Sequence, residues 1–113
     1  MTKREIRADL TDIRYYYTHK PMFDRAEDTG FKNTVVKKAE KYRAYMSRAS
    51  PKLYALFCAL YIEGKTQRAA AQEWGVTEGH IKNVNRQLHQ YLLEEIAKEE
   101  KDNAGCENTG FSG

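Results

Sequence analysis

A group of polar residues between positions 77 and 90 has the types and the spacing needed to bind the edges of DNA base pairs. Arginine and lysine can donate to guanine O6 and N7, asparagine and glutamine can pair with adenine, and glutamate can accept from cytosine N4. At helical spacing these residues fall opposite Ile81, Val84 and Leu88. We therefore expect base contacts from Thr77, Glu78, Gly79, Lys82, Asn83 and Arg86.

A second group of residues is suited to the phosphate backbone of DNA. A short predicted helix begins just before these recognition residues, and the backbone amides and dipole of its first turn attract anions. The phosphate contacts are expected from Thr66, Gln67, Arg68 and Gln90. The motif itself carries little net charge, although neutralised phosphates supply most of the nonspecific affinity for DNA. Three sources of the additional charge stay open: a second subunit, RNA polymerase held nearby, or an auxiliary basic face on an earlier helix, at Lys37, Lys41 and Arg48.

The elements that must position these residues are two helices joined by a three-residue turn. Thr66 can cap a short helix over residues 67–74, Gly75 can adopt a positive φ in the turn, and Thr77 can cap a longer helix that runs to about Ile96. This is the geometry of a helix-turn-helix. Small and apolar residues are expected to face the core at Ala71, Val76, Ile81, Val84, Leu88 and Leu92.

Two amphipathic helices are predicted before this motif. The segment Thr2–Glu5 has the capping-box pattern, and the helix that it opens ends before Pro21. Residues 18–32 form a connection, and a second helix covers roughly residues 33–49. Their apolar stripes suit an antiparallel hairpin and a homodimer interface equally well, and they consist of Ile6, Leu10, Ile13 and Tyr17 and of Val35, Ala39, Tyr42 and Met46.

A third helix should run from Pro51 to about Glu63, because Ser50 can cap it and proline suits its first position. It is apolar nearly all round, which is typical of a buried helix, so both halves of the chain should share one core. The predicted fold is all-α: one domain over residues 1–97, with a helical hairpin (1–49) packed on a helix-turn-helix module (50–97), and a polar, disordered tail over 98–113.

Several other function classes find no support in the sequence. His19, His80, His89 and the two cysteines lack metal-ligand spacing, so neither a metal nor a cofactor is expected. There is no phosphate loop or nucleophile elbow, and we expect no enzymatic activity. No membrane-spanning stretch is present, and Cys58 and Cys106 do not form a disulfide framework, which favours the cytoplasm.

Three segments also carry a resemblance to a known family: SPKLYAL at 50–56, GKTQRAAA at 64–71 and WGVTEGHIKNV at 74–84. Together they resemble region 4 of bacterial sigma factors of the sigma-70 class, over about Ser50–Leu93. The chain from Met1 to about Ile96 looks like the small phage late-gene transcriptional regulators. This resemblance implies promoter binding with the helix from Thr77 in the groove, contact with host RNA polymerase, and activation rather than repression.

Three hypotheses therefore follow. The first is a sequence-specific transcriptional regulator, encoded by a phage or prophage, whose partner is double-stranded DNA. The second is a small terminase-like component of DNA packaging, which a stable ring of subunits would favour. The third is an interaction module that binds RNA polymerase without touching DNA, which intact nucleic-acid phenotypes after alanine substitution of Lys82 and Arg86 would favour.

Overall fold

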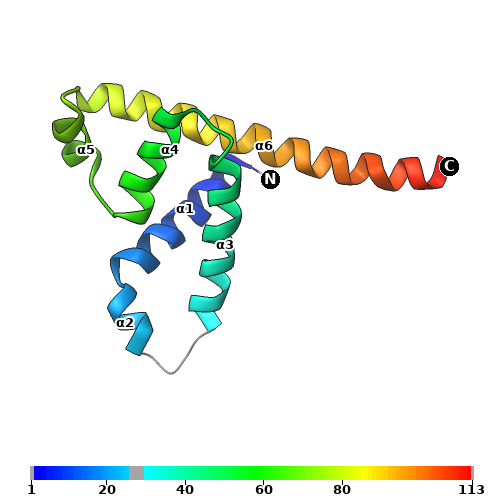
Figure 1. Ribbon diagram of the computed structural model, residues 1–113, viewed down its shortest axis with the longest axis horizontal. Helices are drawn as coiled ribbons and strands as arrows, with labels where there is room; N and C mark the ends of the chain where they lie inside the picture. Colours follow the sequence, from blue (N-terminus) through cyan, green and yellow to red (C-terminus); the bar gives the residue numbers. More distant parts are fainter. Residues whose placement is uncertain (1, 26–29, 113) are drawn as a thin grey trace.

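The computed structural model describes residues 2–25 and 30–112, without the side chains of Phe31 and of residues 102–112. This part of the chain is all-helical and contains no strand, as predicted (Figure 1). Its elements are α1 (Lys3–Thr18), α2 (Lys20–Arg25), α3 (Gly30–Met46), α4 (Pro51–Phe57), a π-helical segment η1 (Cys58–Ile62), α5 (Gln67–Trp74) and α6 (Glu78–Ser112). The predicted connection over 18–32 contains α2, and its residues 26–29 lie outside the described part.

Three of the predicted helix starts are confirmed by side-chain caps. The Oγ1 of Thr2 accepts a hydrogen bond from the Glu5 amide at 3.3 Å, and the Oγ of Ser50 accepts one from the Leu53 amide at 3.4 Å. The Oγ1 of Thr66 accepts from the amide three residues later at 3.0 Å. Each cap pairs one of the backbone donors that a helix leaves unpaired in its first turn, so local sequence fixes where α1, α4 and α5 begin.

The helices α1 and α3 run antiparallel and form the predicted hairpin (Figure 1). Polar contacts join them: the Tyr42 hydroxyl donates to Asp9 Oδ2 at 2.6 Å, and the Lys38 ammonium lies 3.2 Å from the Asp9 carboxylate and 3.5 Å from that of Asp12. The apolar stripe predicted for α3 is buried, together with Tyr45. The hairpin is therefore held within one chain by an apolar seam with a polar edge.

The predicted α1 stripe packs on the core up to its last residue, Tyr17, but it left out the neighbouring Tyr16. Tyr16 is buried at 3% exposure, whereas Tyr17 is only half-buried. Both residues follow Ile13 at a spacing that a helix can place on one side, so the pattern did not separate them. The Tyr16 ring packs 5.6 Å from the ring of Phe23 in α2 and 5.0 Å from the ring of Tyr17.

The central element is α4 with η1, which contacts α1, α5 and α6. The sequence predicted one helix to about Glu63; the structure divides it, since the Glu63 amide donates to Cys58 O five residues earlier, at 2.8 Å. Leu56 and Phe57 are fully buried and belong to one core that includes residues of α1, α3, α5 and α6. The expectation that both halves share a core is confirmed.

Arg14 joins α1 to the segment that leads into α5. Its guanidinium donates to the carbonyl oxygens of Leu60 at 3.1 Å, Gly64 at 3.0 Å and Lys65 at 2.9 Å. These acceptors lie where the π-helical segment ends and its last carbonyls lose their helical partners. Gly64 has φ +72°, and a Cβ there would lie 2.8 Å from Thr18 Oγ1, so the close approach to α1 requires glycine.

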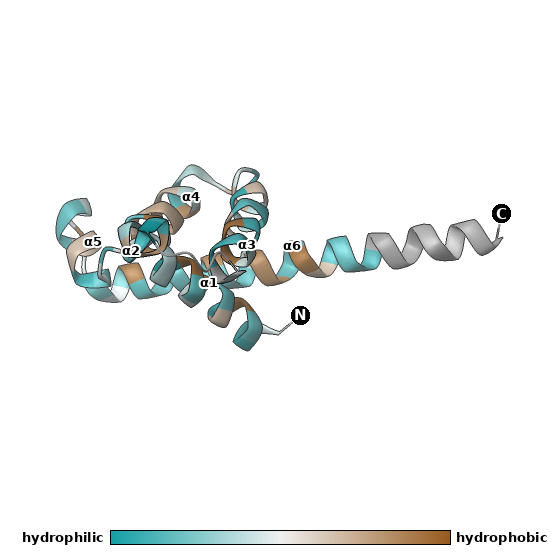
Figure 2. Cartoon of the chain, turned by 90° about the horizontal axis from the view of Figure 1, so that it is seen from below, coloured by the Kyte–Doolittle hydropathy of each residue, from teal (hydrophilic) through white to brown (hydrophobic). Residues whose placement is uncertain are grey.

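The helix α6 is longer than predicted. The sequence indicated an end near Ile96 and a disordered tail over 98–113, whereas α6 continues to Ser112. Residues 97–101 are good helix formers and no proline follows Ile96, so the helix continues although glycines stand at positions 105 and 110. Figure 2 shows apolar residues of α6 where it crosses the other helices and hydrophilic ones directly beyond; side chains 97–101 are exposed.

Replacing Arg14 with methionine keeps much of the apolar stem but removes all three hydrogen bonds. Three part-buried carbonyls then lose a charged donor, so we expect a loss of about 2 kcal/mol or more in the free energy of unfolding. Urea denaturation followed by circular dichroism measures this. Arg4→Met, at an exposed position on the same helix, serves as the control and should change stability by less than about 0.5 kcal/mol. Equal stabilities for the two variants would contradict the role assigned to Arg14.

Candidate nucleic-acid interface

The turn between α5 and α6 has the geometry that the sequence predicted for Gly75. Gly75 adopts φ +67° and ψ 34°, and the amide of Val76 donates to Ala71 O at 2.9 Å. This six-to-one bond is a Schellman ending, which stops α5 and turns the chain into α6. Ala71 is buried where α5 packs on α6, as expected.

The expectation that Val76 points into the core is wrong. Its side chain is 36% exposed, because the left-handed residue before it turns the chain outward. Thr77 follows directly, and its Oγ1 accepts from the His80 amide at 3.1 Å. The predicted cap of α6 is confirmed, so the start of α6 is fixed by the turn and by this hydroxyl.

The polar side of α6 lies opposite its buried residues. Ile81, Val84 and Leu88 are all at most 1% exposed. The six residues predicted to contact bases are all exposed and lie in the first turns of α6 or directly before it: Thr77, Glu78, Gly79, Lys82, Asn83 and Arg86. Within this group the Arg86 guanidinium donates to Asn83 Oδ1 at 3.5 Å. The structure thus presents these residues together on one accessible helix.

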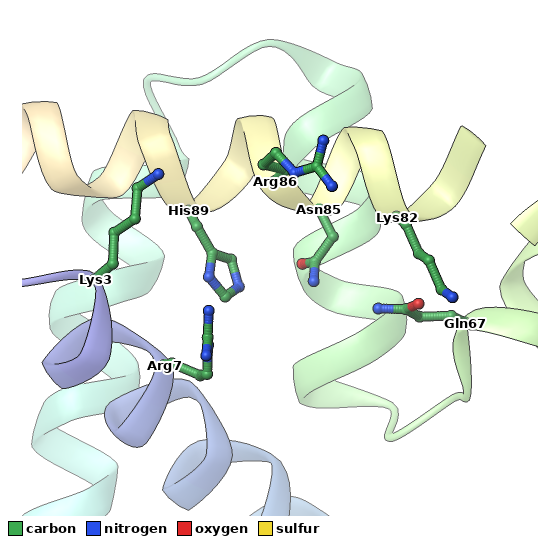
Figure 3. A pocket seen from close by; sticks show the side chains of 7 residues that line it. All are labelled: Lys3, Arg7, Gln67, Lys82, Asn85, Arg86 and His89. Carbon is green, nitrogen blue, oxygen red and sulfur yellow. The ribbon is translucent and has the colours of Figure 1, made fainter. Parts of the chain in front are cut away.

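The four residues predicted to contact phosphates do not form a single cluster. Thr66 and Arg68 are exposed at the start of α5, and the half-buried Gln67 points toward Lys82 of α6 (Figure 3). Gln90 lies one turn beyond Arg86, and its amide donates to Glu94 Oε1 at 3.0 Å. Residues 66–68 therefore flank the start of α6, whereas Gln90 lies farther along it.

A pocket of about 390 Å³ opens beside the polar side of α6, between this helix, α1 and the start of α5. No carboxylate lines it, and the charged side chains around it are all basic (Figure 3). The lining residues are Lys3, Arg7, Gln67, Lys82, Asn85, Arg86 and His89. The pocket extends the basic surface of α6 onto α1.

Lys3 and Arg7 are the residues that sequence reasoning missed. They stand four residues apart, and at helical spacing they share a stripe with Arg14 at the flank of the buried face of α1. That basic stripe was visible in the sequence. Its proximity to α6 was not, because it depends on how α1 packs against α6 and η1.

The predicted auxiliary basic face lies elsewhere. Lys37 is exposed on α3, and the charged groups of Lys41 and Arg48 lie 6.0 Å and 5.9 Å from the centre of the Tyr45 ring. Arg48 Nε also lies 3.7 Å from Glu95 Oε1, nine residues beyond Arg86, which is roughly 13 Å along the helix axis. The structure does not bring this face to the polar residues of α6.

A polar cluster under the pocket fixes the orientation of His89. The Tyr61 hydroxyl donates to Asn85 Oδ1 at 2.8 Å and lies 3.1 Å from His89 Nε2. Since the hydroxyl proton is directed to Asn85, the Tyr61 oxygen accepts from Nε2–H, and Nδ1 is the nitrogen that gains a proton on acidification. Burial, and then the charges of Arg7 and Lys3, lower the pKa of His89 below 6.5.

The remaining features of the described residues suggest no other site. They contain no group of three or more His, Cys, Asp or Glu side chains placed to hold a metal ion. No helix among them is both long and apolar enough to cross a membrane. Comparisons of the chain with protein-family models, curated proteins and solved structures found no significant match.

The low pKa of His89 gives the protein a defined response to acid. The unfolded chain binds a proton near the ordinary pKa of 6.5 and the folded protein only at lower pH, so stability present above 6.5 is lost as pH falls through this window. Thermal unfolding should therefore show a larger drop in Tm between about pH 7.5 and about pH 5.5 for the wild type than for His89→Gln. The control His80→Gln should follow the wild type. An identical drop in all three proteins would contradict this assignment.

Proposed function

We propose that this protein binds double-stranded DNA sequence-specifically, with the first turns of α6 in the major groove. The observation that carries the proposal is the arrangement of α5, the turn at Gly75 and α6. The turn leaves the polar side of α6 exposed, while Ile81, Val84 and Leu88 anchor the opposite side in the core. A rigidly supported helix with an accessible polar side has the dimensions that a major groove admits.

The exposed side chains on α6 match the donors and acceptors of base edges. Lys82 and Arg86 suit guanine, and Asn83 suits adenine. Glu78 can accept from cytosine N4, and Gly79 leaves room for close approach of the helix. At the start of α5, Thr66, Gln67 and Arg68 contact the backbone and fix the register of α6.

The biological setting follows from the resemblance of residues 50–93 to region 4 of sigma-70-class factors. We propose a transcriptional regulator of phage or prophage origin that acts at a promoter and contacts host RNA polymerase there. Binding, rather than catalysis, is the proposed activity. The Cys58 thiol agrees with this, because burial raises its pKa and disfavours the reactive thiolate.

Selection from a genomic fragment library tests the proposal. Purified wild type, Lys82→Ala/Arg86→Ala and the matched control Lys37→Ala/Lys41→Ala are each incubated with the library at two salt concentrations, and the bound fragments are sequenced. We expect wild type and control to enrich one short sequence near promoters. The double variant on α6 should lose this enrichment, since each bidentate base contact contributes about 1–3 kcal/mol of discrimination.

The other results are equally informative. Equal, unselective binding by all three proteins would contradict base recognition by α6 and turn attention to RNA polymerase as the partner. Enrichment at a single locus away from promoters, by a protein that forms a stable ring, would favour a DNA-packaging component.

A further inference from the structure

The pocket between α1 and α6 gathers four basic side chains around one concave space. Several lysines elsewhere in the protein have acidic partners: Lys38 lies 3.2 Å from Asp9, Lys65 lies 2.6 Å from Glu73, and Lys20 lies 2.9 Å from an aspartate. By contrast, no ion pair within residues 2–25 and 30–101 involves any of the four basic residues around the pocket, Lys3, Arg7, Lys82 and Arg86.

Four like charges around one concave space repel each other in the free protein, and an anion placed between them would remove that repulsion. The donors come from two directions. Lys3 and Arg7 rise from α1, while Lys82 and Arg86 belong to α6 (Figure 3). The neutral lining groups, Gln67 and Asn85, are amides that can also donate hydrogen bonds. Such a donor set suits a phosphate group with its several acceptor oxygens.

We propose that Lys3 and Arg7 hold a backbone phosphate on the α1 side of this pocket, on the DNA whose major groove receives α6, while Lys82 and Arg86 on the opposite side are directed to the bases. This inference rests on the proposed function and extends it to Lys3 and Arg7. At helical spacing, Gly79 and Asn83 lie on the outermost side of α6, whereas Lys82, Asn85 and His89 lie on the flank that faces α1. A helix seated in a groove about 12 Å wide brings the sugar–phosphate strand to its flank.

His89 makes the binding at this pocket sensitive to pH. The charged and titratable groups that face it are Lys3 and Arg7 from α1, Tyr61 from η1, and Lys82 and Arg86 on its own helix. Burial, and then the charges of Arg7 and Lys3, disfavour the imidazolium in the free protein. A bound phosphate opposes the effect of these charges, because it places a negative charge beside the imidazole and favours its protonation. DNA affinity therefore rises as pH falls toward the pKa of His89 in the complex.

The test measures how DNA affinity depends on salt. Fluorescence anisotropy is recorded with a labelled duplex that carries the sequence enriched by the wild type, for wild type, Lys3→Gln/Arg7→Gln and the charge-matched control Lys37→Gln/Lys41→Gln. Each lost phosphate contact lowers the slope of log affinity against log salt by about 0.9, so the α1 variant, which loses the one phosphate in the pocket, should lose about 0.9 and the control far less. The α1 variant should still prefer the selected sequence over a scrambled duplex, since backbone contacts carry no direct sequence information.

Two further arms separate the alternatives. Lys3→Gln alone should lower the salt slope by about half as much as the double variant does. Its folding is checked by thermal unfolding, so it replaces the double variant if that protein is unstable. His89→Gln should flatten the rise in affinity toward acid pH. A separate titration with inorganic phosphate, followed by the NMR signals of His89, tests for a small anion as the ligand.

The outcomes separate this inference from the proposed function. An unchanged salt slope in the α1 variants, while the wild type still selects its site, overturns the pocket as a contact and leaves α6 as the DNA-binding element. Saturable binding of inorganic phosphate together with an unchanged slope assigns the pocket to a small anion and also overturns the proposal. If the wild type has no affinity for any duplex, both the proposed function and this inference fail.

Discussion

The hydrogen bonds of Arg14 are the constraint on which the rest of the arrangement depends. One guanidinium holds three carbonyls of the segment between η1 and α5, and Gly64 allows the close approach. This fixes α1 beside the segment that leads into the α5–turn–α6 unit. Because α1 is fixed there, Lys3 and Arg7 at its start lie against α6. The hydrogen bonds of Arg14, which lie away from the candidate DNA-binding surface, therefore help to position the basic residues of α1 on that surface.

The features that follow from local rules were predictable from the sequence. Capping hydroxyls at Thr2, Ser50 and Thr66 mark helix starts, and Gly75 occupies the left-handed position that ends α5. The features that depend on packing between elements were not predictable. The burial of Tyr16 beside the predicted Tyr17 depends on how α1 packs in the shared core. The π-helical bonding of η1 has no sequence signal of its own.

The candidate site also has one part that was predictable from the sequence and another that depends on packing between helices. Periodicity alone places the polar residues of α6 opposite the core, and the structure agrees. The auxiliary basic face proposed from the sequence lies on α3 and directly after it, at Lys37, Lys41 and Arg48. There, however, Arg48 is paired with Glu95, and it lies over an aromatic ring. The cations nearest to α6 come from α1, and only the packing of α1 against α6 reveals them.

The most direct test of the central claim, that α6 and its flanking residues form the DNA-binding surface, maps that surface on the wild-type protein. Amide and arginine side-chain NMR signals are followed while an unlabelled mixed-sequence duplex is added at low ionic strength. We expect saturable changes at the first turns of α6, at residues 66–68 and at Lys3 and Arg7, with α3 largely unaffected. Changes centred on the α3 residues Lys37 and Lys41, or no saturable change at all, would contradict it.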